Sequence, residues 1–325
     1  MPGFTTHYIF GMKAYNDMPF TPLKHTIAKY RWLYQLGLQG PDMFFYNIPI
    51  LRHRDYRNVG SYMHEHKVNA FFECCLRRIG TIRSRQQQEE AISYLAGFMN
   101  HYIADSICHP YVYGRIGYPV DAPTSMHHGM HAHLENELDA ILLWKYKKKK
   151  PSEFNQTATI CLNGQEIQFI SHFLASCINE TYYPITYRNN FQVTPAMVHR
   201  SIWALHFGCR TLSDKNGKKK FGIAQVESIF VNHPVASAKM VTDSVTDYRS
   251  SCNLNHEAWG NPWDPTRVST ASFVDLFHET LDKCSRVYAL LNSAVTDNVP
   301  LDKQDLSPLL TELGNESYHS GLPVD

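Results

Sequence analysis

The sequence lacks several features that would indicate other classes of protein. Its first residues contain no cationic segment followed by an apolar run, and no stretch of about 18 apolar residues is present to span a membrane. The net charge is only +1, and the run Lys147 to Lys150 is interpreted as a solvated helix end, so no clear nucleic-acid patch is predicted. The eight cysteines include no CxxC pair. We therefore expect a cytoplasmic protein with reduced, mostly buried thiols and no signal peptide.

Histidine is abundant instead, and it is unevenly distributed. The chain has 18 histidines, and 11 of them lie within the first 133 residues. Hydrophobic residues make up 43% and charged residues 19%, which is typical of a globular chain that can bury a substantial core. The histidine-rich first part of the chain is therefore the candidate region for a chemical site.

Helical periodicity dominates the chain and predicts an all-α, multi-helix bundle. The one β signal is a pair of short alternating runs around Asn163-Gly164, which indicates a small hairpin near residues 157–170. We expect a single domain over residues 1–325, with a metal site built mainly from 1–145, supporting helices in 166–297 and a loose tail over 298–325. The expected helices cover about 23–38, 61–80, 84–110, 125–147 and 269–295, with further helix starts at Thr194-Pro195 and His233-Pro234.

The segment around His101 carries the strongest chemical pattern. His101, Asp105 and His109 are spaced four residues apart, so a helix places all three on one stripe. The residues between them are largely apolar, which sets the stripe next to a core-facing surface. A buried carboxylate and two imidazoles must either pair with one another or bind a metal ion, and this segment alone leaves both interpretations open.

A second segment repeats the pattern. His131, Glu135 and Asp139 also recur every four residues, and two such stripes that converge supply the nitrogen and oxygen ligands that zinc takes. His133 and Glu137 form a competing pair at the same spacing. The spacing alone leaves open which of the two sets faces the metal.

Three further candidates lie upstream: His7, Asp42 in a Gly-Pro-Asp turn, and His64. Together with the HYIAD segment (101–105) and the HAHLENELD segment (131–139), they resemble the zinc-dependent phospholipase C family, which is related to the single-strand-specific zinc nucleases. The resemblance covers residues 1–145. It implies an all-helical fold, three clustered zinc ions and the hydrolysis of phosphodiesters.

The resemblance also implies a register for the second segment, in which His131 and Glu135 face the metal while His133 and Glu137 point to solvent or to other helices. It further implies a role for each residue. One zinc ion would be held by Asp42, His64, His101 and Asp105; Asp105 would bridge to a second ion that His7 helps to hold; and His131 and Glu135 would hold a third, with Asp139 orienting His131.

Two features depart from the family pattern. The family places a further histidine for the third zinc where this chain has Tyr111, and His109 is the nearest substitute. Secreted members also use the amino group of their processed N-terminal residue, whereas this sequence starts at Met1, six residues before His7.

The implied reaction is hydrolysis of a phosphodiester, either a phospholipid headgroup or a nucleotide. Metal ions about 3.5–4 Å apart share a hydroxide that attacks phosphorus in line, so no side-chain nucleophile is needed. Asp105 would bridge the metals, and Asp42 is a candidate general base as well as a ligand. Two alternatives remain: a nuclease or nucleotidase that uses the same metals, and a non-catalytic protein in which the metal only braces the helices.

Overall fold

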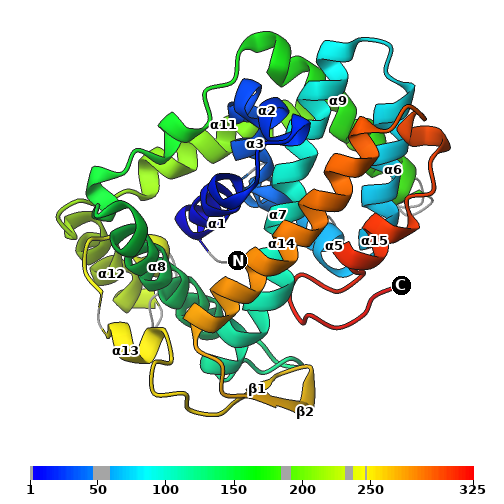
Figure 1. Cartoon of the computed structure of the whole chain (residues 1–325). Coiled ribbons are helices and arrows are strands. Elements are labelled where there is room, and N and C mark those ends of the chain that lie inside the picture. The colour runs from blue at the N-terminus through cyan, green and yellow to red at the C-terminus, as the bar shows by residue number, and fades with distance from the viewer. Residues whose placement is uncertain (1–2, 47–58, 184–191, 231–236, 246) are drawn as a thin grey trace.

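Helices make up most of the computed structural model, which describes residues 3–46, 59–183, 192–230, 237–245 and 247–325 (Figure 1). The prediction of an all-α bundle with a small hairpin is confirmed, since the one sheet in these ranges has two antiparallel strands, β1 (Trp259–Asn261) and β2 (Asp264–Ser269). The helices are α1 (Phe4–Asp17), α2 (Pro22–Lys29), α3 (Arg31–Gly37), α5 (Val59–Glu65), α6 (Val68–Thr81), α7 (Arg85–Arg115), α8 (Ser125–Lys147), α9 (Gly164–Thr181), α11 (Pro195–Leu212), α12 (Lys218–Phe230), α13 (Tyr248–Ser251), α14 (Phe273–Thr296) and α15 (Ser307–Leu313). Short 3-10 turns are η1 (Gly40–Tyr46), η2 (Pro151–Glu153), η3 (Gln156–Thr159), η4 (Ser237–Lys239) and η5 (Leu301–Lys303).

Helix α7 is the structural centre around which the site is built. Nearly every residue from Glu90 to Val112 is buried, because α1, α2, α3 and α14 pack around it. Helix α3 approaches most closely through two glycines. A Cβ atom on Gly37 or on Gly97 would lie 2.1 Å from a carbonyl oxygen of the opposite helix, so only glycine permits this contact.

Most predicted helices are present, but three of them differ from the prediction. The helix predicted over 61–80 is broken between α5 and α6, where Lys67 has φ +49°. The helix predicted over 23–38 is broken at Tyr30, which ends α2 and begins α3 with φ −115° and ψ 43°. The helix predicted to end at Pro110 continues as α7 to Arg115. A proline inside a helix removes one backbone hydrogen bond. Burial of Tyr111 and Val112 in the turn that follows offsets this loss.

The hairpin predicted near residues 157–170 is wrong. These residues form η3 and the start of α9, and the hairpin lies at β1 and β2 instead. The Asn163 side chain accepts hydrogen bonds from the backbone N–H groups of Gln165 and Glu166, while the Glu166 carboxylate accepts one from the N–H of Asn163. This reciprocal capping stabilises a helix start, and the Asn-Gly pair serves it in place of a β-turn.

The tail predicted to be loose beyond residue 298 is packed against the rest of the chain. Its apolar side chains join the core, and the N–H of Lys67 donates to the carbonyl of Asp325. The prediction of a loose tail rested on the polar composition of this segment, which does not reveal that its apolar side chains are buried. The buried members are Leu301, Leu306, Leu309, Leu313 and Tyr318. The helix start predicted at His233-Pro234 lies outside the described residues.

Candidate metal centre

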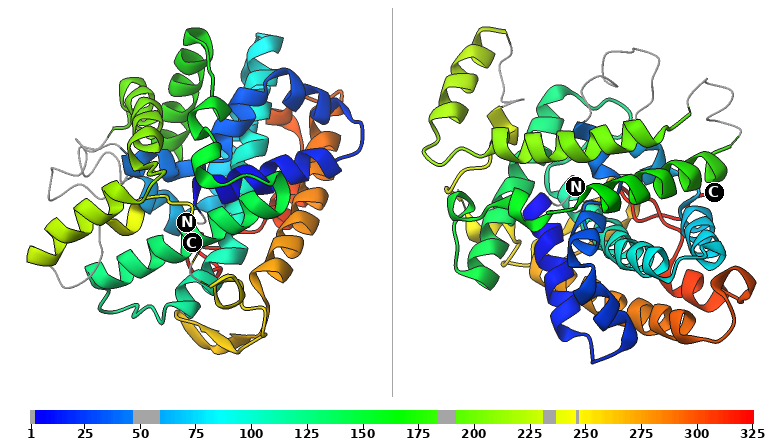
Figure 2. Two further views of the ribbon diagram at one scale, coloured as in Figure 1. Left: turned by 90° about the vertical axis from the view of Figure 1, so that its left-hand side faces the viewer. Right: turned by 90° about the horizontal axis from the view of Figure 1, so that it is seen from above.

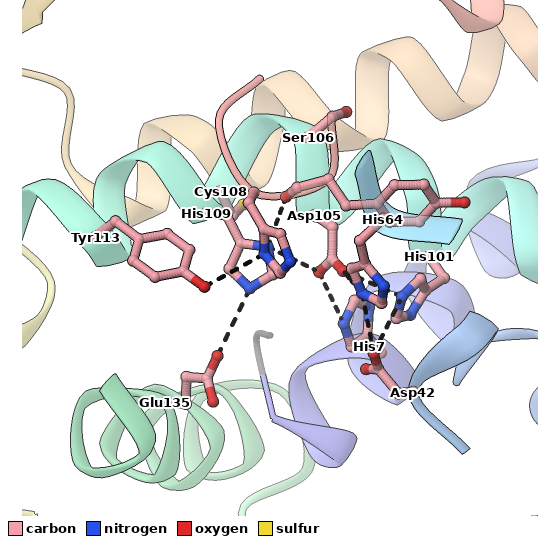
Figure 3. A network of polar contacts seen from close by, with 12 residues as sticks. His7, Asp42, His64, His101, Asp105, Ser106, Cys108, His109, Tyr113 and Glu135 are labelled. Carbon is pink, nitrogen blue, oxygen red and sulfur yellow. Dashed lines mark hydrogen bonds and ion pairs between the residues drawn. The ribbon is translucent and has the colours of Figure 1, made fainter. Parts of the chain in front are cut away.

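The predicted site residues converge on one buried stripe of α7 (Figure 3). His101, Asp105 and His109 lie on successive turns of this helix. The remaining predicted residues reach them from four other elements: His7 from α1, Asp42 from η1, His64 from α5, and both His131 and Glu135 from α8. All eight positions predicted as metal ligands therefore lie along this stripe, seven of them in two adjoining groups and His7 beside Asp105.

The first group contains Asp42, His64, His101 and Asp105, whose ligand-type atoms all lie within 4.8 Å of one another. One carboxylate oxygen of Asp42 is 3.3 Å from His64 Nε2 and 3.8 Å from His101 Nε2. The same two nitrogens lie 3.8 Å and 3.1 Å from Asp105 Oδ2. Two nitrogens and two carboxylates thus surround a single point, which is the donor set of a four-coordinate zinc ion.

Backbone carbonyl groups orient both histidine rings of the first group. His64 Nδ1 lies 2.6 Å from the carbonyl oxygen of Gly60, and His101 Nδ1 lies 3.1 Å from that of Leu38. A proton on Nδ1 that donates to the carbonyl leaves Nε2 with its lone pair, so each ring presents a ligand atom to the centre.

The turn before Asp42 depends on a glycine. Gly40 has φ +47°, in the left-handed region that favours glycine, and a Cβ atom there would lie 2.2 Å from His101 Cδ2. The Gly-Pro-Asp sequence therefore serves two purposes. It reverses the chain after α3, and it lets Asp42 approach the His101 ring.

The second group contains His109, His131 and Glu135, again with ligand-type atoms within 4.8 Å of one another. Glu135 Oε1 lies 2.6 Å from His131 Nε2 and 3.7 Å from His109 Nε2. His109 Nδ1 is 2.7 Å from the carbonyl oxygen of Tyr318, so its Nε2 is the nitrogen directed toward Glu135. This group offers two nitrogens and one carboxylate to an ion.

Asp105 connects the two groups, and His7 lies beside it. Asp105 Oδ1 is 3.1 Å from His7 Nε2 and 3.8 Å from His109 Nδ1, while Oδ2 faces the first group. The His7 ring stacks on the His101 ring with centroids 4.0 Å apart. The carboxylate of Asp105 is thus placed between two candidate ion positions, as a bridging ligand must be.

Burial and charge set the protonation of these groups before any cation enters. Burial disfavours a charge on Asp105, but the neighbouring imidazoles of His109, His101 and His7 hold its pKa well below the usual value. Burial also opposes a charge on His101, yet the carboxylates of Asp105 and Asp42 raise its pKa. In the second group, burial lowers the pKa of His109 and raises that of Glu135, each by a wide margin. Neutral imidazoles and carboxylates that are costly to charge alone are stabilised by a dication.

The contacts within the site leave some buried polar atoms without a hydrogen bond. The chemical type of these atoms shows whether a metal ion fits the site. Several make no hydrogen bond to any residue that the structure describes, although they lie 3.1–3.8 Å from groups of opposite character. A buried polar atom without a hydrogen bond costs about 1–3 kcal/mol. These atoms are His7 Nε2, Asp42 Oδ1, His64 Nε2, His101 Nε2, His109 Nε2 and both oxygens of Asp105. All are zinc-type donors, so the residues fit the ion.

On α8 the predicted register is the one that the structure shows, but one role is wrong. His131 and Glu135 face the stripe of α7, whereas the Glu137 carboxylate accepts a hydrogen bond from Ser251. Asp139 does not orient His131. Its two carboxylate oxygens accept hydrogen bonds from the backbone N–H groups of Thr5 and Thr6, at 3.1 and 2.7 Å. Asp139 therefore caps α1, the helix that carries His7.

Tyr111 takes no part in either group. Its hydroxyl donates to the carbonyl of Ser251 at 2.7 Å, and its ring packs against Trp259 and Phe273. The structure thus places His109, two residues before the family's position, beside His131 and Glu135.

The C-terminal segment contributes residues to the site that the sequence did not reveal. His319 stacks on His64 with centroids 4.9 Å apart and lies 5.6 Å from the His109 ring. Its Nδ1 is 3.3 Å from the hydroxyl of Tyr113, and the N–H of Tyr318 donates to the carbonyl of His64. The only sequence signal for His319 was a histidine in a polar segment, because its nearness to α5 and α7 depends on how the chain end packs.

The model of the family described as zinc dependent phospholipase C matches residues 6–187 of the chain. This match covers more than half of the sequence and includes every predicted ligand. The chain therefore belongs to the zinc-dependent phospholipase C family. No curated protein matches the chain, and no solved structure does. In the described residues, no helix is long and apolar enough to cross a membrane.

Proposed function

We propose that this protein is a zinc-dependent phosphodiester hydrolase. The observation that carries the proposal is the convergence of eight histidine and carboxylate side chains along α7, six of which direct buried ligand atoms without a hydrogen bond into the site. Membership of the zinc-dependent phospholipase C family supports the same conclusion. The substrate class is a phosphodiester, with a phospholipid headgroup favoured over a nucleotide.

In this proposal the residues form three overlapping ligand sets. Asp42, His64, His101 and Asp105 hold one ion; Asp105 and His7 contribute to a second; and His109, His131 and Glu135 hold a third. Zinc ions in these positions lower the pKa of water and offset negative charge on the phosphoryl oxygens.

The protein's own groups then orient the reactants. Asp105 contributes to the first and second ligand sets, since its Oδ1 faces His7 and its Oδ2 faces His101. Asp42 reaches the first group from the turn η1 and is proposed to accept the proton of the attacking water. No serine or cysteine nucleophile is required.

The test combines metal analysis with two substrates. Purified protein is assayed for zinc content and for hydrolysis of p-nitrophenyl phosphorylcholine and of single-stranded DNA, before and after chelation and after zinc is restored. The proposal expects zinc-dependent hydrolysis of the choline ester. Hydrolysis of DNA alone would instead establish a nuclease. Bound zinc with neither activity, together with a fall in melting temperature on chelation, would establish a metal that only braces the helices.

A further inference from the structure

Helix α11 exposes an aromatic pair on the surface of the molecule. Trp203 and Phe207 are 65% and 52% exposed, and their rings stack with centroids 5.5 Å apart at an angle of 11°. They are four residues apart and so lie on one helical face, while the opposite face buries Val198, Ile202 and Leu205. Large aromatic side chains on a surface are costly in water and mark a contact with another phase or molecule.

The next helix also exposes large apolar side chains. A short turn leads from α11 to α12, and both helices lie toward the left of Figure 1. Phe221 and Val226 of α12 are 67% and 57% exposed. Four of the large exposed hydrophobic side chains of the described residues thus fall within one segment, 195–228.

The exposed charges of this segment are all positive. Its two acidic side chains are turned inward: Asp214 is buried and accepts from the N–H of Lys220, and the Glu227 carboxylate accepts from Ser237. Helix α11 contains no acidic residue at all. The exposed cations are Arg200, Arg210, Lys215, Lys218 and Lys219. In a chain with a net charge of +1, this is a marked local concentration.

We propose that this surface, the α11–α12 face (Trp203, Phe207, Phe221, Val226 and the five cations), docks onto the anionic surface of a phospholipid bilayer. Aromatic rings flanked by arginine and lysine suit the headgroup boundary, where the rings enter the acyl region and the cations remain near the phosphates. A single-stranded nucleic acid would require a groove with separated rings on which bases stack. Here the two rings of α11 stack on each other and project from the outer side of a helix.

The buried face of α11 connects this surface to the candidate metal centre. It packs against η1, the turn that carries Asp42. Gly208 of α11 fits against the ring of Tyr46 so closely that a Cβ atom would lie 2.3 Å from it. Viewed from above in Figure 2, α11 lies beside α9 across the top of the molecule. A phospholipid in a bilayer is then the favoured substrate; this consequence rests on the proposed function, whereas adsorption to the bilayer does not.

The experiment measures binding without catalysis, by co-sedimentation of the full-length protein with vesicles. The vesicles contain phosphatidylcholine alone or phosphatidylcholine with phosphatidylserine. We expect binding to the mixed vesicles, weaker binding in high salt, and at least about tenfold weaker binding of the double variant Trp203→Ala/Phe207→Ala. The matched control, Phe20→Ala/Val299→Ala, removes two exposed hydrophobic side chains elsewhere and should bind like the parent protein.

A second pair of variants tests the charges. Arg200→Glu/Arg210→Glu should weaken binding to the mixed vesicles by about fivefold or more per site, since each cation near an anionic surface contributes about 1 kcal/mol. Arg83→Glu/Lys303→Glu makes the same change in net charge at exposed positions outside α11 and α12 and should have a much smaller effect.

Hydrolysis of p-nitrophenyl phosphorylcholine by the same variants separates this inference from the proposed function. Unchanged hydrolysis with lost vesicle binding supports the docking surface, and vesicle binding by a protein without any hydrolytic activity would refute only the proposed function. Equal vesicle binding by Trp203→Ala/Phe207→Ala and its control would overturn the docking surface. The docking surface would also be overturned if Trp203→Ala/Phe207→Ala kept vesicle binding but lost self-association or binding to single-stranded DNA.

Discussion

Replacing Asp105 by asparagine removes the negative charge that the two ligand groups share. Asp105 Oδ1 faces His7 and His109, and Oδ2 faces His64 and His101, at distances of 3.1–3.8 Å. The asparagine amide has the same shape but only one oxygen. Its NH2 group replaces the other oxygen, so hydrogen-bond donors face one of the two pairs of histidines. One pair of histidines, with any ion that it helps to hold, therefore loses its anionic partner.

The size of the effect follows from these contacts. A contact to a charged group contributes about 1.5–3 kcal/mol, so losing two of them removes about 3–6 kcal/mol, or roughly 150- to 20,000-fold in affinity. We therefore expect Asp105→Asn to bind at least one fewer zinc ion. Turnover of a phosphodiester should fall by several orders of magnitude, because the ion and the water that it activates are lost together.

A second buried carboxylate provides the matched control. Asp139 is also buried and also contacts α1, but both of its oxygens accept hydrogen bonds from backbone N–H groups that begin the helix. Asp139→Asn should lower the melting temperature, since loss of a cap costs about 1 kcal/mol, and should retain zinc. Asp105→Asn should show the reverse, with little change in folding and a large loss of zinc. Elemental analysis, thermal unfolding and turnover are measured on the same preparations of both variants.

Two results would refute this reasoning. Full zinc content and full turnover in Asp105→Asn would show that this carboxylate is not a shared ligand. A sharp fall in its melting temperature, in a protein whose parent form has no activity to lose, would show that the metal stabilises the fold and does no chemistry.

Three further predictions concern single features of the site. His109→Ala should reduce zinc content by one ion while Tyr111→Phe leaves it unchanged, and equal zinc in both would show that His109 is not the shifted ligand. Gly40→Ala should reduce both the zinc content and the melting temperature, because the added Cβ atom would collide with His101. Gly117 has a similar positive φ but open space around it, so Gly117→Ala should lower the free energy of unfolding by about 1–2 kcal/mol and leave the zinc content unchanged. Equal zinc loss in both variants would contradict the steric argument. Zinc binding to metal-free protein should release protons near neutral pH, because the pKa of His101 is raised by the carboxylates beside it against the effect of burial. Calorimetric enthalpies that do not vary with the buffer's ionisation enthalpy would contradict this.

The spacing of ligand residues along single helices was predictable from the sequence. His101, Asp105 and His109 recur every four residues, and α7 places them on one buried stripe. Helical geometry alone requires this, whatever the rest of the fold does. The same spacing left the register of α8 open, and the family resemblance selected the set that faces the site, His131 and Glu135, while Glu137 turns to Ser251.

Predictions from local sequence patterns were wrong where one pattern is compatible with two different structures. Asn163-Gly164 suits a β-turn and also a helix cap, and the choice depended on Glu166 and on the burial of α9. Pro110 normally ends a helix, but α7 continues because the residues after it are buried. Asp139 has the spacing of a partner for His131, yet the start of α1 lies within reach of its carboxylate and takes both oxygens.

The sequence by itself determined the helical class, the two ligand stripes and the donor types suited to zinc, because these depend on residue identity and on the period of a helix. Only the tertiary structure decided which distant residues meet them. His319 joins the site because the C-terminal segment packs against α5 and α7, and Asp214 leaves the α11–α12 face positive because its carboxylate is buried. Contacts between residues far apart in the chain are selected by the packing of the whole core, for which no local pattern of residues carries a signal.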